Sequence, residues 1–275
     1  MGDKKLIFLD IDGTLTPAGS NVPPESALKA IRAAQQKGHL VFLCTGRNLA
    51  MLAPVLAYGF DGVVGSAGGY VTVGDTVIYD QPMEHETFEK ALNALHESGV
   101  FCTIEGKDAT YGDENLGDFL STAGGVNSEI ERWRKALAAD LGIQPMNLYD
   151  GRPIYKIVFM CTDAWQLDKA KALVEDEYAF VCQRVEAHGC LNGELINRAF
   201  DKGRAILRIC DYLGIGVEDT YGFGDSMNDL EMIDTVGYSV AMENGDPTIK
   251  AHSKLVCPSV EEDGLAIAFE QLGLC

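Results

Sequence analysis

The sequence predicts an α/β protein whose core is a doubly wound parallel sheet, with an α+β segment inserted into it. Three observations point to this fold class. Short apolar runs alternate with amphipathic helical patterns, the alternation then gives way to a hairpin, and a long mixed segment follows before the alternation resumes. Alternation of this kind is typical of βαβ units, which place helices on both faces of a parallel sheet.

The first part of the core is defined by its apolar runs. Leu6–Leu9, Leu40–Cys44 and Gly62–Gly65 are short and apolar without alternation, as expected for strands buried on both faces. Helical patterns begin at Pro24 and at Asn48, between these runs. Together they predict a Rossmann-like core, to which a helix over 202–213, a short helix over 227–233 and a strand over 238–240 are added later.

The inserted segment begins after a hairpin. Two β-rich runs, 70–73 and 76–79, flank Gly74-Asp75, which favours a tight turn. From there the pattern reads helix, strand, helices, strand, helix and strand, with two helices expected across 116–139. We therefore expect a catalytic core of residues 1–81 plus 186–275 and an α/β cap domain of residues 82–185, which is long enough to form a small domain.

The composition excludes several classes of partner. The net charge is −19, from 41 acidic and 22 basic residues, and a field of this sign repels nucleic acid and anionic membranes. The eight cysteines form no C-x-x-C pair, so no local sequence motif indicates a zinc site. Free thiols in a chain of this size favour a reducing compartment. We expect no signal peptide, no membrane span, a cytoplasmic location, and a monomer or homodimer.

Four polar stretches follow or flank the predicted strands. They are "FLDIDGTLT" with Asp10 and Asp12, "LCTGR" with Thr45 and Arg47, "DKG" with Lys202, and "GFGDSMNDLEM" with Asp225, Asn228 and Asp229. Each is weak evidence alone, since D-x-D and Thr-Gly are common in loops. Ligands of open parallel sheets bind beyond the carboxyl ends of the strands, so we expect all four stretches to meet in one crevice.

A crevice that contains these side chains would be suited to bind a phosphoryl group. Four gathered carboxylates repel one another, a divalent cation relieves the repulsion, and ligands that are all oxygen favour magnesium over zinc. Lys202 adds an ammonium and Thr45 a hydroxyl, which can neutralise and hydrogen-bond phosphate oxygens. We therefore expect Mg²⁺ as cofactor and a phosphorylated substrate.

The nucleophile is expected to be a carboxylate. No cysteine, serine–histidine pair or phosphate-binding loop competes, and the five histidines lie outside all four stretches. Asp10 ends its strand and is the natural nucleophile. Asp12 can protonate the leaving oxygen and then deprotonate the water that cleaves the aspartyl phosphate.

These motifs resemble a known family. "DIDGT", "TGR", "KG" and "GDSMND" are similar to the four motifs of haloacid dehalogenase superfamily phosphatases, and "VAMENGDPTIKAHSKLV" with "EEDGLAIAFE" is similar to the Cof-type branch, subclass IIB. The resemblance covers about residues 1–81 and 186–275. It implies that Asp10 is the nucleophile, Asp12 the acid/base, and that Thr45 and Lys202 bind phosphate.

The resemblance also implies a metal site. Magnesium would be held by Asp10, Asp225 and the backbone carbonyl of Asp12, with Asp229 supporting the metal shell. Asn228 would lie at the edge of the metal shell and bind substrate phosphate, and Asn244 matches a position near the metal site. Arg47 would either face the phosphate or brace the loop. One departure stands out, since Ser66 and Ala67 occupy positions where the family commonly has Asn-Gly.

Motif spacing indicates where the cap is inserted. Only 32 residues separate Asp12 from Thr45, whereas 156 separate Thr45 from Lys202, so the cap lies between the second and third motifs, as in Cof-type proteins. Substrate choice is expected to reside there. The expected function is hydrolysis of a small phosphorylated metabolite, either a sugar phosphate or a phosphorylated cofactor. The alternatives are a phosphosugar mutase of related fold and a non-catalytic sensor of a phosphometabolite.

Overall fold

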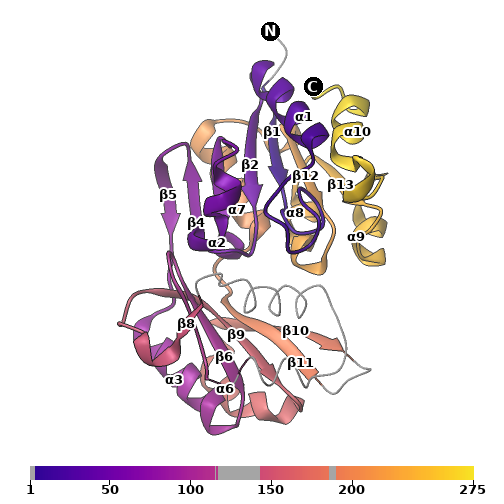
Figure 1. Ribbon diagram of the computed structural model, residues 1–275. Coiled ribbons are helices and arrows are strands. Elements are labelled where there is room, and N and C mark those ends of the chain that lie inside the picture. Colours follow the sequence, from indigo (N-terminus) through magenta and orange to yellow (C-terminus); the bar gives the residue numbers. More distant parts are fainter. Residues whose placement is uncertain (1–3, 115, 117–142, 186–189) are drawn as a thin grey trace. The chain divides into compact units, whose positions relative to one another are not determined.

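The computed structural model describes residues 4–114, 116, 143–185 and 190–275, and these form two compact units (Figure 1). Unit 1 contains the residues up to 47, residues 52–80 and residues 200–275; unit 2 contains residues 48–51 and 81–199. The boundaries of core and cap at 81/82 and 185/186 stay a prediction. Except for residue 116, the two helices expected across 116–139 lie outside the described residues.

Unit 1 is built on a sheet of eight described strands, in the order β14-β13-β12-β1-β2-β3-β4-β5. The strands from β14 to β3 are parallel, and β4 and β5 extend the sheet antiparallel through the predicted hairpin. The strands are β1 (Leu6–Leu9), β2 (Leu40–Cys44), β3 (Gly62–Gly65), β4 (Tyr70–Val73), β5 (Thr76–Asp80), β12 (Thr220–Gly224), β13 (Tyr238–Met242) and β14 (Leu255–Cys257).

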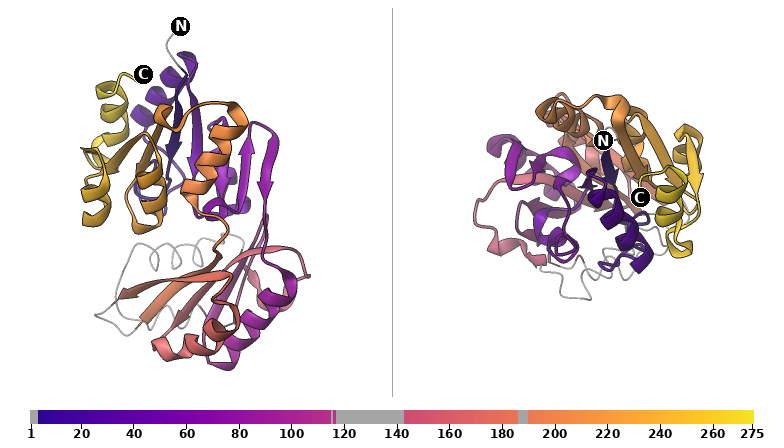
Figure 2. Two further views of the ribbon diagram at one scale, coloured as in Figure 1. Left: turned by 180° about the vertical axis from the view of Figure 1, so that it is seen from behind. Right: turned by 90° about the horizontal axis from the view of Figure 1, so that it is seen from above.

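Helices cover both faces of this sheet, which confirms the predicted doubly wound core (Figure 2). On one face Phe8 and Phe42 pack with Ile206 of α7, in a cluster that α8 also joins. On the other, the rings of Phe223 and Phe269, on α10, lie 5.2 Å apart. The helices of this part are α1 (Glu25–Gln36), α2 (Leu49–Leu56, of which residues 49–51 belong to unit 2), α7 (Lys202–Leu213), α8 (Leu230–Thr235), α9 (Pro247–His252) and α10 (Gly264–Gln271).

Unit 2 is a largely antiparallel sheet with helices packed on one face. The strand order is β10-β11-β9-β6-β7-β8, with only β7 and β8 parallel among the described pairs. Phe88 and Leu95 of α3 pack with Ile104 and Ile157 of the sheet. The elements are α3 (His85–Glu97), β6 (Phe101–Gly106), β7 (Thr110–Gly112), β8 (Ile143–Pro145), β9 (Ile154–Cys161), α6 (Asp168–Val174), β10 (Tyr178–Val185) and β11 (Cys190–Asn197).

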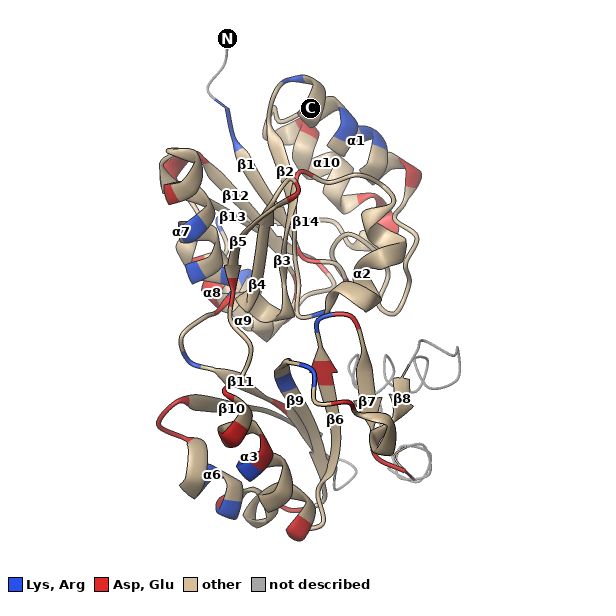
Figure 3. Ribbon diagram, turned by 90° about the vertical axis from the view of Figure 1, so that its left-hand side faces the viewer, with Lys and Arg blue, Asp and Glu red and all other residues tan. Residues whose placement is uncertain are grey.

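The sheet of unit 2 also contains buried charge. Lys156 of β9 is fully buried, with its Nζ 2.6 Å from Glu194 Oε1 on β11 and 3.4 Å from Glu105 Oε2 on β6; β9 and β6 lie in the lower part of Figure 3. The opposite charges compensate one another, as buried charges must. Among the described helices, none combines the length and the apolar character needed to cross a membrane.

Candidate active site

Three neighbouring strands bring the first site residues together. β1 lies between β12 and β2, and all three strands run parallel. Asp10 follows β1, Asp225 follows β12 and Thr45 follows β2, so the three residues lie at the same edge of the sheet. The backbone N–H of Asp10 also donates to the carbonyl of Phe223 at 3.0 Å, which extends the β1–β12 pairing as far as the candidate nucleophile.

The first residue of α7 supplies a buried cation. Asp201 caps this helix by accepting a hydrogen bond from the backbone N–H of Arg204. The Nζ of Lys202 donates to Asp10 Oδ1 at 2.7 Å and to Asp229 Oδ1 at 2.5 Å. All three side chains are at most 6% exposed. One ammonium is therefore shared by two carboxylates in surroundings that water barely reaches.

Asp229 also fixes the turn that follows β12. Its Oδ2 accepts hydrogen bonds from the backbone N–H groups of Asp225 and Ser226, at 3.0 and 3.1 Å. Gly224 leaves the necessary room, since a Cβ there would lie 2.7 Å from the Asp229 Cβ. Because both Asp229 oxygens are engaged, its geometry suits a residue that orients Asp225.

The turn at Gly13 packs directly on Asp225. Gly13 has φ +91°, and a Cβ at this position would lie 2.4 Å from Asp225 Oδ2. Thr14 donates its hydroxyl to Asp225 Oδ1 at 3.1 Å. Asn244 donates its side-chain amide to the Gly13 carbonyl at 2.8 Å and accepts from the backbone N–H of Val260. Only glycine combines this conformation with this close approach.

Burial and mutual repulsion disfavour the charged forms of Asp10 and Asp225. Burial, and then repulsion from Asp229, raises the pKa of Asp10 to about 7, even though Lys202 lowers it. Burial, and then repulsion from Asp10, raises the pKa of Asp225 to about 8. Carboxyl groups with such pKa values retain protons near neutral pH unless a further cation replaces them.

Arg47 contacts the candidate acid/base. Its Nε donates to Asp12 Oδ2 at 2.8 Å and its Nη2 to Asp12 Oδ1 at 2.7 Å. The guanidinium thus lies on the Asp12 carboxylate, and the role of Arg47 toward the phosphate stays a prediction. Thr45 is buried, with its Oγ1 accepting the backbone N–H of Arg47 at 3.2 Å. Asn228 is exposed and lies at the edge, 3.5 Å from the Lys202 Nζ.

A family model described as haloacid dehalogenase-like hydrolase matches residues 7–269. The chain belongs to this family. Its relatives include YkrA of Bacillus subtilis, 30% identical over 99% of both chains, and the 5-amino-6-(5-phospho-D-ribitylamino)uracil phosphatase YwtE of the same organism, 28% identical over 98% of both chains. The sugar phosphatase BT4131 of haloacid dehalogenase subclass IIB shares the fold, with a TM-score of 0.78 and 24% identity over 99% of this chain and all of the other.

This membership of the haloacid dehalogenase-like hydrolases confirms the family resemblance found in the sequence. It also confirms the predicted enzyme class, a phosphoric monoester hydrolase. The four motifs of the family therefore fall on the strand and helix ends described above. The role of each side chain stays a prediction.

The carboxylates of this hydrolase fit a hard divalent cation. One oxygen from each of Asp10, Asp225 and Asp229 lies within 4.8 Å of the others. The donors are all oxygen, which favours magnesium, and a bound cation would offset the burial and mutual repulsion that raise the pKa values of Asp10 and Asp225. The residues present therefore fit Mg²⁺.

Sequence reasoning missed several contacts of this site. Thr14 lies within the first motif and was given no role, yet its hydroxyl donates to Asp225 Oδ1. Gly19, Ser20 and Asn21 contact the Asp12–Arg47 pair. They lie in a loop without periodicity, and nothing in their sequence signals the contact.

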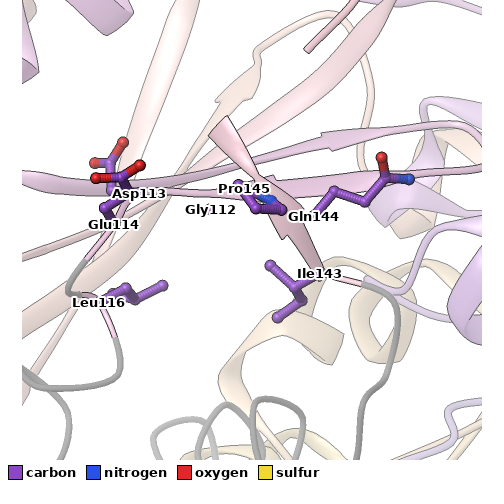
Figure 4. Close-up of a pocket in the computed structure, with 7 residues that line it drawn as sticks. All are labelled: Gly112, Asp113, Glu114, Leu116, Ile143, Gln144 and Pro145. Carbon is purple, nitrogen blue, oxygen red and sulfur yellow. The ribbon is translucent and has the colours of Figure 1, made fainter. Parts of the chain in front are cut away.

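A cavity of about 190 Å³ lies elsewhere, in unit 2 (Figure 4). Gly112, Asp113, Glu114, Leu116, Ile143, Gln144 and Pro145 line it, at the β7–β8 edge. None of the residues of the carboxylate cluster lines it, and it is smaller than the usual ligand pocket of about 300–1,000 Å³.

Proposed function

We propose that this protein is a magnesium-dependent phosphatase that hydrolyses small phosphorylated metabolites through an aspartyl phosphate on Asp10. The observation that carries the proposal is the buried arrangement of Asp10, Lys202 and Asp229 beside Asp225, at the end of β1. A carboxylate nucleophile, a fixed ammonium and an oxygen-rich cation site are what phosphoryl transfer needs.

The first step joins Asp10 to phosphorus. A carboxylate oxygen of Asp10 attacks phosphorus in line, the bond from phosphorus to the leaving oxygen breaks, and Asp12 gives that oxygen its proton. Bound Mg²⁺, held by Asp10, Asp225 and the carbonyl of Asp12, would neutralise the phosphate oxygens. In the second step a water oxygen attacks phosphorus, the bond to Asp10 breaks, and Asp12 takes the proton of the water.

Lys202 has the donors to serve both the protein and the substrate. An ammonium has three N–H donors. Two reach Asp10 and Asp229 at 2.7 and 2.5 Å, and Asn228 Oδ1 lies 3.5 Å away, at the limit of a hydrogen bond. We propose that a phosphate oxygen takes this third donor, with Thr45 binding another phosphate oxygen.

The substrate is proposed to be a sugar phosphate or a phosphorylated cofactor. The relative YwtE is named for a phosphorylated ribityl compound, and the subclass IIB neighbour is named a sugar phosphatase. We propose that unit 2, the counterpart of the cap predicted from the sequence, selects the leaving group.

A panel of phosphorylated metabolites tests the proposal. We expect phosphate release with Mg²⁺, its loss in excess chelator and its return when Mg²⁺ is restored. Asp10→Asn serves as the blank for contaminating phosphatases. Full activity in excess chelator would refute the metal assignment, an isomeric phosphate in place of free phosphate would identify a mutase, and binding without any turnover would identify a sensor.

A further inference from the structure

Within the described residues, the carboxylate of Asp12 accepts hydrogen bonds from at least three N–H donors. Besides the two hydrogen bonds from Arg47, at 2.7 and 2.8 Å, the backbone N–H of Gly19 donates to Asp12 Oδ1 at 3.1 Å. The two Arg47 bonds form the bidentate, side-on geometry that is the strongest arrangement of this pair. The Asp12 side chain is 22% exposed and that of Arg47 is 6% exposed.

Arg47 is itself fixed at both ends. Its Nη1 donates to Asn21 Oδ1 at 2.6 Å and its Nη2 to the carbonyl of Ser20 at 3.3 Å. Its backbone N–H donates to Thr45 Oγ1 and its carbonyl accepts from the backbone N–H of Ser66 at 2.9 Å. A guanidinium anchored in this way can hold its partner in one orientation, because neither end is left to move.

We propose that Arg47 is a positioning residue for the second step of the reaction, in which Asp12 acts as a carboxylate base toward water. The proposal rests on the proposed function. A guanidinium only donates hydrogen bonds, and so does a backbone N–H. Both carboxylate oxygens of Asp12 therefore accept from fixed donors, which hold them in one orientation.

The two steps make different demands on this arrangement. An activated aryl phosphate needs little help from an acid, so breaking the bond to its leaving oxygen depends little on how Asp12 is held. Cleaving the aspartyl phosphate requires the carboxylate, which the donors fix in place while the water proton passes to it and the phosphorus–Asp10 bond breaks. Removal of Arg47 should therefore slow cleavage of the aspartyl phosphate more than its formation.

Arg47→Met tests the inference, because methionine removes every side-chain N–H donor of Arg47 while filling part of the space. With an activated aryl phosphate, which needs little help from an acid, we expect a burst of about one aryl product per chain, followed by steady-state turnover about 10- to 100-fold below wild type. Acid quenching should trap more phosphorylated enzyme than in wild type. Arg47→Lys keeps the positive charge but cannot form the bidentate pair of hydrogen bonds. Its steady-state rate should lie between those of Arg47→Met and wild type.

Two further variants complete the experiment. Asn21→Ala removes a hydrogen-bond partner of Arg47 but keeps the guanidinium and its two donors to Asp12. It should therefore change the burst, the steady-state rate and the trapped phosphorylated enzyme in the same direction as Arg47→Met, but by less. If Arg47→Met does not fold, the Asn21→Ala result decides whether Arg47 has the positioning role. Arg32→Met removes an exposed arginine of α1 that contacts the carbonyl of Gly59, and it should leave burst and turnover unchanged.

The outcomes separate this inference from the proposed function. If wild type releases no phosphate from any substrate, the proposed function fails. If wild type is active but Arg47→Met slows burst and turnover equally, forms aryl product more slowly without a burst, turns over faster, or behaves as wild type, the positioning role is wrong and the proposed function stands.

Discussion

Replacing Lys202 by methionine tests the electrostatics of the site most directly. Lys202 is 1% exposed and compensates two carboxylates that are themselves almost completely buried. Removing one partner of a buried ion pair typically costs about 3–5 kcal/mol, because an uncompensated buried charge remains. We expect Lys202→Met to lower the free energy of unfolding by about this amount at pH 8 without metal.

The loss should depend on pH in a definite direction. The pKa of Asp10 is raised to about 7 in the folded protein, above its value in the unfolded chain, so the folded state binds this proton more tightly. The contribution of Asp10 to stability therefore falls as pH rises through about 7. Lys202 lowers this pKa, so the variant should hold the proton to higher pH, and it should lose less stability at pH 6 than at pH 8.

Urea unfolding followed by circular dichroism measures the effect. In excess chelator the Lys202→Met variant should unfold at a lower urea concentration than wild type. Mg²⁺ should restore part of the lost free energy of unfolding, because a cation again compensates the carboxylates. Lys169→Met is the matched control, since Lys169 pairs with Glu97 where both side chains are more than half exposed; it should cost at most about 1 kcal/mol. A loss at Lys202 no larger than that of the control would refute the reasoning.

Three further predictions concern the chemistry and the backbone. Asp10→Asn should reduce phosphate release by at least about a thousandfold while the circular dichroism spectrum is retained, since an amide is a poor nucleophile; a tenth of the wild-type rate would rule out Asp10 as nucleophile. Gly13→Ala should lower turnover by about 100-fold, since its Cβ would displace Asp225; unchanged magnesium dependence and rate would contradict this. Ala67→Gly should raise the free energy of unfolding by about 0.5–1 kcal/mol, because Ala67 has φ +57°. The control Ala33→Gly, within α1, should lower the free energy of unfolding. If both substitutions changed it in the same direction, backbone strain at Ala67 would not be the cause.

The site residues that could be predicted from the sequence are those that directly follow a strand. Asp10 and Thr45 each follow an apolar strand, Asp225 follows β12, and parallel strands bring their carboxyl ends to one edge. No knowledge of side-chain packing is needed for this step. Lys202 was harder to place, since it is 192 residues from Asp10, yet its position at a helix start after the inserted segment sufficed.

Other features depend on contacts that a sequence pattern does not encode. The direction of the Arg47 guanidinium depends on Asn21 and on the Ser20 carbonyl, which lie in an aperiodic loop. The glycine of the Lys-Gly motif has a packing reason, because a Cβ at Gly203 would lie 2.5 Å from the Glu231 carbonyl oxygen of α8. The strands β7 and β8 have three residues each, too few to show alternation, and were missed.

The departure at Ser66 and Ala67 can be understood from the backbone. Both residues lie in the left-handed region, with φ +48° and +57°, which Asn and Gly adopt more readily than Ser and Ala. The turn donates the N–H of Ser66 to the Arg47 carbonyl at 2.9 Å and that of Ala67 to the Thr45 carbonyl at 3.0 Å. What holds the second motif in place is therefore a pair of backbone amides, which any sequence that tolerates the turn can supply.

The same turn explains how the second and third motifs are kept in register. Gly68 has φ +106°, and a Cβ there would lie 2.4 Å from the backbone carbonyl oxygen of Asp201, the capping residue of α7. Because Lys202 is the next residue, anything that pushes Asp201 away also moves the ammonium that serves Asp10. The turn thus links the loop after β2 to the start of α7 by backbone contacts on both sides. Its conformation is therefore required by the geometry of the site, and the strain at its first two residues is a cost that this geometry imposes.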